Sequence, residues 1–332
     1  MAGFAVETIQ TEALKRSLCE QYGFTEEMKI ELLKYSENLT YQMETADKRY
    51  VLRIYRPGYH DPQELYGEIL WQKRLKEDTG LHLADILPGK NGKMLQQTEI
   101  GGKTYDIAVF SFVSGKVLRD LSGERLYHYM EKMGEITGIL HSHAIGWEYA
   151  GKLKRFHWDF QYLVGENARW GNFMEMKTLT DSQKKWYGEA VKIAEKRLQK
   201  YGKTRERYGL IHGDLNINNI LVDGETLYVL DFDDCGWGWY LYDIPTAVLE
   251  DFGEPMQMGL DAVLRGYERY RPLSPEEKRE LDTFNVLKKI VRIGWIATRS
   301  DNDTVKKVKP DYYRQTAALA REYIEQYSEK NT

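Results

Sequence analysis

The stretch 211-IHGDLNINNILV-222, followed by 229-VLDFDD-234, is the most informative part of this sequence. The apolar run from Asn219 to Val222 predicts a β-strand, and a second strand is predicted from Thr226 to Phe232. Asp223-Gly224 lies between them, and an Asp-Gly pair is typical of a two-residue hairpin turn. The hairpin would bring Asn219 and Asp231 close together.

The polar residues around the predicted hairpin suit phosphoryl transfer. The amide oxygen of Asn219 beside the carboxylate of Asp231 offers the hard oxygen ligands that Mg²⁺ prefers. Asp214 precedes them, and a carboxylate there could orient a hydroxyl group and accept its proton. Phosphoryl transfer needs these parts: metal ligands, a base and an in-line hydroxyl. The alternative is a purely structural strand hairpin in which the polar residues occur by chance.

The residue types and their spacing resemble a known family. The pattern H-x-D-x-x-x-x-N, from His212 to Asn219, is similar to the catalytic loop of protein kinases. His-Gly-Asp-Leu with the later Asp-Phe-Asp resembles the aminoglycoside, choline and homoserine kinase superfamily. The run from Asp231 to Gly236, followed by Trp239 to Asp243, is similar to its phosphotransferase enzyme family branch, which includes bacterial stress-response kinases and homoserine-kinase-like proteins. The likeness spans about Tyr35 to Val248.

The resemblance implies a role for each residue of the segment. Asp214 would be the catalytic base, and Asn219 and Asp231 would hold Mg²⁺. His212 would support the catalytic loop. Asp233 stands where protein kinases have glycine, which favours a small-molecule kinase over a eukaryotic-like protein kinase.

The resemblance also implies a nucleotide site earlier in the chain. Arg53 stands where the family usually has the strand lysine that grips the nucleotide phosphates, and Glu68 would be its ion-pair partner. The stretch Phe110 to Val113 would be a hinge in which Ser111 and Val113 bind adenine through backbone groups.

Two departures concern the nucleotide. Arginine at position 53 can pair with phosphate in a bidentate way, but its geometry differs from that of lysine. The sequence from Phe24 to Pro57 contains no glycine, so the nucleotide loop near Ser36 to Thr40 is not glycine-rich. ATP is the expected donor, and GTP stays possible.

The rest of the chain predicts an α+β, protein-kinase-like fold with two lobes. Residues 1–113 would form a small nucleotide-binding lobe with an antiparallel sheet of about five strands. A helix would begin at Pro62 behind a capping box made by Asp61 and Glu64, and end near Gly80. Two-residue hairpin turns are predicted at Asn91-Gly92 and Gly101-Gly102. The expected strands are Ile30–Tyr35, Thr40–Glu44, Arg49–Tyr55, a strand near Ile86, Met94–Thr98 and Tyr105–Phe112, with a possible helix at Glu12–Gly23.

Residues 114–332 would form a larger, mainly helical lobe that contains the catalytic loop and metal motif. Asp243 precedes Ile244-Pro245-Thr246, and a helix cap is its expected role, with contact to the substrate as the alternative. His141 and His143 would lie two apart on a helix and face different sides, so packing is expected there rather than a metal site. The expected helices are Leu126–His143, Asp181–Lys200, Pro255–Tyr270, Pro275–Thr298 and Asp311–Tyr327.

Composition limits the kind of protein. The 332 residues include 47 basic and 51 acidic side chains, so the net charge is −4, which argues against a nucleic-acid binder with a strongly basic surface. The two cysteines, Cys19 and Cys235, fit a reducing compartment. No apolar run approaches membrane-spanning length, and the first residues do not resemble a signal peptide. We expect a cytoplasmic protein that binds neither membrane nor nucleic acid, and its oligomeric state is not indicated.

The expected activity is transfer of the γ-phosphoryl group of ATP, or GTP, to a hydroxyl group of a small molecule, with Mg²⁺ as cofactor. The acceptor would be a small metabolite or an amino alcohol, recognised by loops between Gly146 and Thr180 and helices after Pro255. Two alternatives stay open: a serine/threonine protein kinase of the bacterial stress-response type, and a nucleotide-binding pseudokinase without turnover.

Overall fold

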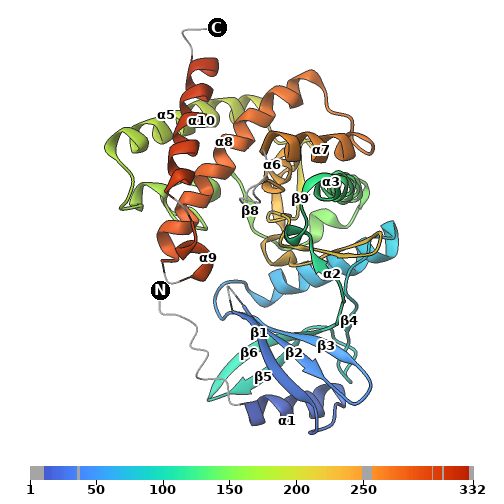
Figure 1. The fold of residues 1–332 in the computed structure, drawn as a ribbon. Helices are drawn as coiled ribbons and strands as arrows, with labels where there is room; N and C mark the ends of the chain where they lie inside the picture. Colours follow the sequence, from blue (N-terminus) through green and yellow to red (C-terminus); the bar gives the residue numbers. More distant parts are fainter. Residues whose placement is uncertain (1–10, 36–37, 249–255, 301, 309, 329–332) are drawn as a thin grey trace. The chain divides into compact units, whose positions relative to one another are not determined.

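The computed structural model describes residues 11–35, 38–248, 256–300, 302–308 and 310–328 (Figure 1). Ser36 of the predicted nucleotide loop and Pro255 at the start of a predicted helix lie outside these ranges. None of the helices in the described part of the chain combines the length and apolar character that a membrane span requires.

The chain forms two compact units. The first contains the described residues of Met1–Lys116 together with Leu153–Arg155 and Leu221–Leu230. The second contains Val117–Lys152, Phe156–Ile220 and the described residues of Asp231–Thr332. The predicted division into residues 1–113 and 114–332 stays a prediction.

A six-stranded antiparallel sheet is the main element of the first unit, where about five strands were expected (Figure 1). Its order is β1-β2-β3-β6-β4, and β5 also pairs with β6. The nine residues of β6 are enough to accommodate both β5 and the two-residue β4 along one edge. The strands are β1 (Lys29–Tyr35), β2 (Leu39–Glu44), β3 (Arg49–Ile54), β4 (Ile86–Leu87), β5 (Gln96–Ile100) and β6 (Lys103–Ser111).

The two predicted turns have different outcomes. Gly101-Gly102 joins β5 to β6 as predicted, and both glycines have positive φ, 59° and 74°, as this hairpin turn requires. Asn91-Gly92 is a turn but does not join two paired strands, because β4 pairs with β6 rather than with β5. The interpretation of Asn91-Gly92 as a hairpin was therefore wrong.

Two helices belong to the first unit. In α1 (Thr11–Tyr22), Leu14 and Leu18 are buried in the sheet core, and the helix lies beside β5 (Figure 1). The second helix, α2 (Pro62–Thr79), has the predicted capping box between Asp61 and Glu64. It ends where Gly80 takes a left-handed conformation, as predicted.

The predicted hairpin around Asp223-Gly224 is present. It consists of β10 (Ile220–Asp223) and β11 (Thr226–Val229), in a three-stranded sheet with β7 (Lys116–Val117). The second strand ends three residues earlier than predicted, because Asp231 has a left-handed backbone that interrupts the extended conformation.

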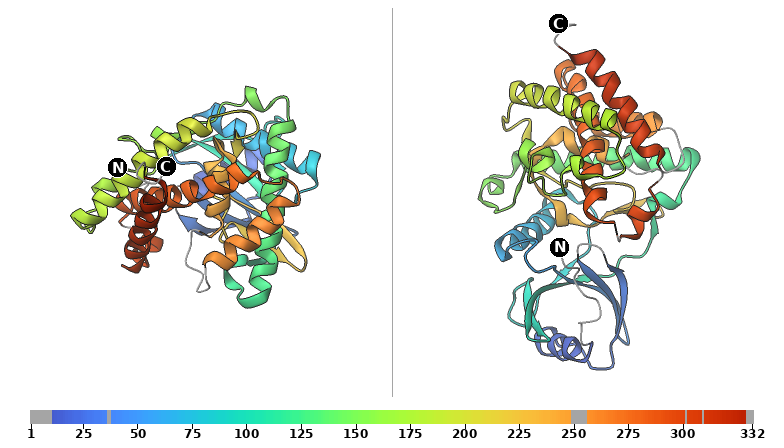
Figure 2. Two further views of the ribbon diagram at one scale, coloured as in Figure 1. Left: turned by 90° about the horizontal axis from the view of Figure 1, so that it is seen from above. Right: turned by 90° about the vertical axis from the view of Figure 1, so that its left-hand side faces the viewer.

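Helices dominate the second unit, as expected. The long ones are α3 (Gly123–Gly146), α5 (Asp181–Tyr201), α7 (Met256–Glu268), α8 (Pro275–Thr298) and α10 (Asp311–Tyr327), and the short ones are α4 (Phe160–Val164), α6 (Asp243–Thr246) and α9 (Asp303–Lys306). Gly134 of α3 and Gly266 of α7 let these two backbones touch, because an added Cβ at either would lie within 2.0 Å of a carbonyl oxygen of the other helix. Figures 1 and 2 show α5 beside α10, which it contacts.

A small sheet in the second unit was not predicted. In it, β12 (Gly236–Trp239) runs antiparallel to β9 (Tyr208–Ile211) and parallel to β8 (His157–Trp158). Strands of two to four residues, one of them alternating glycine and tryptophan, are too short to show a clear period in the sequence.

Candidate active site

The loop that follows β9 carries the predicted base. From Ile211 to Asn219 the residues are buried except Asp214 and Asn218, which are half-buried. Asn216 shapes this loop, because its side-chain oxygen accepts a hydrogen bond from the backbone N–H of Asn218 at 2.9 Å. The loop is thus fixed by its own polar groups, with the Asp214 carboxyl at its more accessible part.

Gly213, immediately before Asp214, is held in a strict conformation. Its φ of 79° favours glycine, and an added Cβ would lie 2.4 Å from the carbonyl oxygen of Asp234 and 2.8 Å from Nε1 of Trp158. The N–H groups of His212 and Gly213 donate to the two oxygens of the Asp243 carboxylate, both at 2.8 Å. The backbone before the predicted base is therefore clamped from two sides.

Asp243 does not cap a helix, and that expectation was wrong. The N-cap residue of α6 is Tyr242, and this N-cap has no side-chain hydrogen bond. The Asp243 side chain instead turns to the catalytic loop and is buried there. The local sequence hardly distinguishes this role from capping. The one signal for burial of Asp243 is its position between two apolar neighbours, Tyr242 and Ile244.

His141 of α3 completes a buried network around Asp243. Its Nε2 lies 3.2 Å from the Asp243 carboxylate and its Nδ1 lies 3.0 Å from the Tyr267 hydroxyl. Burial by itself would raise the pKa of Asp243, but the hydrogen bond from His141, and the positive charge that His141 and His212 carry when protonated at low pH, hold this pKa below its usual value. Burial lowers the pKa of His141. We therefore assign a neutral ring that donates from Nε2 to an ionised Asp243 and accepts the Tyr267 proton at Nδ1.

Asn219 and Asp214 are brought together by the loop. Nδ2 of Asn219 donates to the backbone oxygen of Asp214 at 2.9 Å and to its Oδ2 at 3.2 Å. Both partners are acceptors, so the amide nitrogen must face them, and the amide oxygen is the atom that would bind a cation.

Asp231, the other predicted metal ligand, has a strained backbone. Its φ of 60° and ψ of 68° make it the one non-glycine residue with positive φ in the described part of the chain. Such conformations concentrate at functional sites. Next to it, Phe232 packs on the ring of His212, with centroids 4.6 Å apart, so His212 joins the loop to the metal motif while being fully buried itself. The closeness of Asn219 and Asp231 stays a prediction.

The donor set fits a hard cation by its chemistry, since it offers an amide oxygen and a carboxylate. The described residues contain no cluster of three or more histidine, cysteine, aspartate or glutamate side chains that could hold a metal. An ion held by Asn219 and Asp231 would therefore keep several water or phosphate ligands, which is usual for Mg²⁺.

In the first unit, Arg53 of β3 and Glu68 of α2 form an ion pair with a separation of 3.4 Å. Glu68 is fully buried and also accepts a hydrogen bond from Gln72 at 3.1 Å. The Arg53 side chain, 14% exposed, lies near the rings of Phe110 and Tyr55. This pairing fixes the direction of the guanidinium; its role in binding phosphate stays a prediction.

The predicted hinge lies at the end of β6. The N–H of Ser111 donates to the Asp85 oxygen at 2.7 Å, and the N–H of Phe112 donates to the Arg49 oxygen at 3.3 Å. Those two N–H groups are therefore occupied. That Ser111 and Val113 bind adenine through backbone groups stays a prediction.

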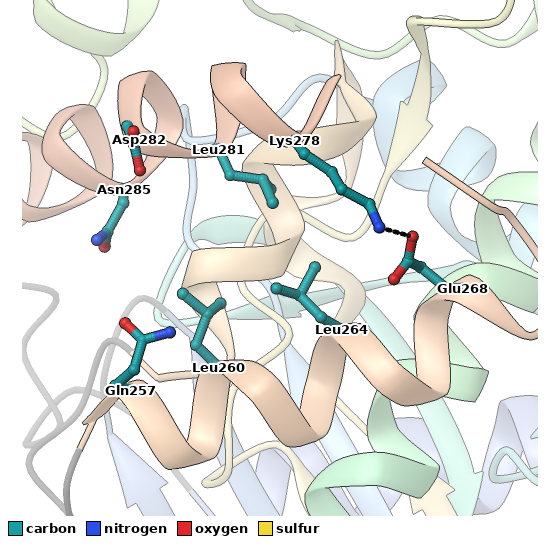
Figure 3. Close-up of a pocket in the computed structure, with 8 residues that line it drawn as sticks. All are labelled: Gln257, Leu260, Leu264, Glu268, Lys278, Leu281, Asp282 and Asn285. Carbon is teal, nitrogen blue, oxygen red and sulfur yellow. Dashed lines mark ion pairs between the residues drawn. The ribbon is translucent and has the colours of Figure 1, made fainter. Parts of the chain in front are cut away.

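A separate hollow of about 300 Å³ lies in the second unit between α7 and α8 (Figure 3). Leucine side chains from both helices face each other in it, and an ion pair between Lys278 and Glu268 closes one end. The lining residues are Gln257, Leu260, Leu264, Glu268, Lys278, Leu281, Asp282 and Asn285, and none of them is a predicted site residue.

Known proteins resemble this chain over most of its length. Amicoumacin kinase of Bacillus subtilis (strain 168) is 23% identical over 91% of this chain and 88% of its own. Stress response kinase A of Salmonella choleraesuis is 24% identical over 95% of this chain and 93% of its own. The solved structure of a microcompartment-associated aminopropanol kinase superposes with a TM-score of 0.84 at 27% identity, covering 96% of this chain and 99% of the other.

The expected protein-kinase-like fold is confirmed by this superposition together with the sheet of the first unit and the helices of the second. Residues 31–273 match the phosphotransferase enzyme family, a range that contains the predicted catalytic loop, the predicted metal motif and the Arg53–Glu68 pair. The chain is a phosphotransferase of the kinase class and belongs to the phosphotransferase enzyme family.

Proposed function

We propose that this protein transfers the γ-phosphoryl group of a nucleoside triphosphate to a hydroxyl group of a small amino alcohol. ATP is the proposed donor, GTP is the alternative, and Mg²⁺ is the proposed cofactor. The observation that carries the proposal is the setting of the accessible Asp214 carboxyl. This carboxyl accepts a hydrogen bond from Asn219, and the backbone of its loop is held by Asp243.

Asp214 would act as the base. It would accept the proton of the acceptor hydroxyl while that oxygen bonds to the γ-phosphorus and the bond to the bridging oxygen of the nucleoside diphosphate breaks. A fixed carboxylate is effective here because most of the catalysis in phosphoryl transfer is positioning and charge stabilisation. His212 is fully buried, so it would position the loop and would not touch substrate.

Asn219 and Asp231 would hold Mg²⁺, which when bound neutralises phosphate charge. In the first unit, Arg53 would bind nucleotide phosphates, and Glu68 would keep its guanidinium in place. Ser111 and Val113 would bind the base of the nucleotide through backbone groups.

The proposed acceptor class is supported by the likeness to the aminopropanol kinase, which extends over almost the whole of both chains. The first test is thermal unfolding with ATP, GTP or no nucleotide, each with and without Mg²⁺. A ligand at 100 times its dissociation constant stabilises a protein by about 2.7 kcal/mol, which shifts a melting curve measurably. A metal-dependent rise with one nucleotide identifies the donor, and that nucleotide is then used to screen amino alcohols for phosphorylation.

A second candidate is a serine/threonine protein kinase, because a Salmonella typhimurium relative with that description aligns over 95% of this chain. Phosphorylation of protein substrates or of the enzyme itself, in preference to all small hydroxyl compounds, would favour this candidate. A folded protein that shows no shift with either nucleotide would favour a form without turnover.

A further inference from the structure

Lys288 of α8 is a fully buried lysine that contacts the catalytic loop. Its Nζ donates a hydrogen bond of 2.8 Å to the backbone oxygen of Gly213. That carbonyl belongs to the peptide group that joins Gly213 to Asp214. A residue 75 positions away in sequence therefore holds the peptide on which the proposed base begins.

The ammonium group of Lys288 is enclosed by aromatic rings. Nζ lies 4.4 Å from the ring centroid of Tyr242 and 4.8 Å from that of Trp170. Trp158 packs against both rings, edge-on to Trp170 and stacked on Tyr242. The rings attract the cation by their electron-rich faces and leave the Gly213 carbonyl as its hydrogen-bond acceptor.

The backbone of Trp170, one of the residues whose rings surround the ammonium group, is itself held on α8. The Trp170 carbonyl accepts hydrogen bonds from Oγ1 of Thr298 at 2.8 Å and from the guanidinium of Arg299 at 3.1 Å. The next residue, Gly171, touches the helix backbone, because a Cβ added to Gly294 would lie 2.0 Å from the Gly171 oxygen. The lysine thus reaches the loop beside an aromatic side chain whose backbone is fixed to α8.

A buried ammonium group is costly, and packing alone does not require one. Burial lowers the pKa of Lys288, and the nearby carboxylates of Asp214, Asp243 and Asp234 act against this and favour its charged form. In its ammonium form the lysine places a positive charge among the carboxylates that surround the loop.

We propose that Lys288 is a positioning residue for phosphoryl transfer, which fixes the Gly213–Asp214 peptide and thereby the direction of the Asp214 side chain. Asp243 holds the N–H of Gly213 and Lys288 holds its carbonyl, so the two residues fix both peptide groups of this glycine. The proposal rests on the proposed function, because it assigns Lys288 to the same reaction.

The consequence concerns accuracy of transfer as well as its rate. When Asp214 is misdirected, the acceptor hydroxyl loses its alignment and water competes for the phosphoryl group. The ratio of acceptor phosphorylation to nucleotide hydrolysis then falls. This ratio does not depend on how much of the sample is folded, so a general loss of stability leaves it unchanged.

The test compares Lys288→Met and Lys288→Gln with Lys289→Met. Lys289 is the matched control, since it is the next residue of α8, is also buried, and donates to the Val248 carbonyl. For each variant we would measure kcat with an amino alcohol, the Kd of the nucleotide, and the ratio of acceptor phosphorylation to hydrolysis.

Lys288→Met is expected to lower kcat and the ratio by about 10- to 100-fold, the size expected for loss of a hydrogen bond from a charged donor, with the nucleotide Kd unchanged. Lys288→Gln keeps an N–H donor and should recover part of the ratio. Lys289→Met should leave the ratio at the wild-type value.

An unchanged ratio in Lys288→Met overturns the proposal, as does equal behaviour of the methionine and glutamine variants. If both Lys288 variants fail to fold, the role of the residue is in stability, and this result overturns the proposal as well. A wild-type protein that binds nucleotide but phosphorylates no hydroxyl compound instead sinks the proposed function on which this inference depends, so the two failures are distinguishable.

Discussion

The two units hold their proposed functional groups in different ways. In the first, the functional side chain is itself the anchored group: Arg53 is paired with Glu68, 15 positions later. In the second, Asp214 is carried by a backbone that is anchored by Asp243 and Lys288, 30 and 75 positions after Gly213. One site is held through its side chain and the other through its peptide groups.

This difference predicts different responses to substitution. Changing a partner of Arg53 affects a single side chain, while changing a partner of the Gly213 backbone moves the whole loop with Asp214 and Asn219. Loss of a loop anchor should therefore affect kcat, and loss of the Arg53 pair should affect binding of the nucleotide. The substitutions below test this difference.

Asp214→Asn should have the largest effect on catalysis. The amide has the shape of the carboxylate but cannot accept the hydroxyl proton, so kcat should fall by about 10²- to 10⁴-fold. The nucleotide Kd, measured by calorimetry, should stay the same. Asp223→Asn in the exposed turn of the hairpin is the control and should behave as wild type. Loss of nucleotide binding in Asp214→Asn would show that this residue is structural.

Arg53→Ala tests the anchored side chain of the first unit. We expect the nucleotide Kd to rise by about 10- to 100-fold, because a charged hydrogen-bond donor to phosphate is lost. Arg53→Lys should bind more tightly than the alanine variant. Arg74→Ala removes a partly exposed arginine that pairs with Glu77 and Asp78 of α2, and the nucleotide Kd of this variant should not change. An unaltered Kd in Arg53→Ala would remove Arg53 from the proposed site.

Asp243→Asn tests the backbone anchor of the second unit. One of its two carboxylate oxygens becomes an amide nitrogen, so a buried N–H of His212 or Gly213 loses its acceptor. The free energy of unfolding should fall by about 1–3 kcal/mol, and kcat should fall with it. The exposed Asp261→Asn is the control. Wild-type stability in urea unfolding of Asp243→Asn would contradict the role of the clamp.

The same network predicts how stability depends on pH. The pKa of His141 in the folded protein is below its ordinary 6.5, so the unfolded chain binds more protons just below that pH, and stability should fall as the pH drops below about 6.5. The pKa of Asp243 is below its ordinary 3.8, so its contribution is present above that value and is lost at still lower pH. His141→Asn should remove the first step in urea titrations at several pH values. A step of unchanged size in that variant would assign it to another group.

The sequence predicted most of the first unit because its signals are local. The capping box of Asp61 and Glu64, the glycine at position 80 and the β-branched, aromatic and apolar side chains of β3 each depend on residues within one element. The same applies to α8 and α10, whose bounds agree with the prediction. The pairing of β4 with β6 could not be predicted in this way, because a turn sequence such as Asn91-Gly92 does not determine which strands become neighbours.

The candidate site shows the same limit. The motif from His212 to Asn219 located the loop and predicted its chemistry, and the structure bonds Asn219 to Asp214 within it. The residues that anchor the loop were not found, because Asp243 and Lys288 act through the backbone of Gly213 and any acidic or basic residue buried at that place could do so. Only the tertiary fold shows which residue that is.

Asp61→Ala should have the smallest effect and sharpens the comparison between the units. Asp61 accepts hydrogen bonds from the N–H groups of Gln63 and Glu64, both at 2.9 Å, and its loss should cost about 1 kcal/mol of stability. Its ion pair with Lys154 is exposed and adds little. Thr180→Ala removes the matched capping box at α5 in the second unit.

The two cap variants, Asp61→Ala and Thr180→Ala, test whether the two units unfold separately or together. Because α2 carries Glu68, fraying of α2 in Asp61→Ala should weaken nucleotide binding slightly. The kcat at saturating nucleotide should equal that of wild type, since the Asp214 loop has its anchors in α3, α6 and α8. Calorimetric unfolding should show each variant lowering a different transition if the two units unfold separately, and the same transition if they unfold together. A drop of kcat in Asp61→Ala at saturating nucleotide would contradict the division of roles, because it would mean that the helix of the first unit helps to position the base.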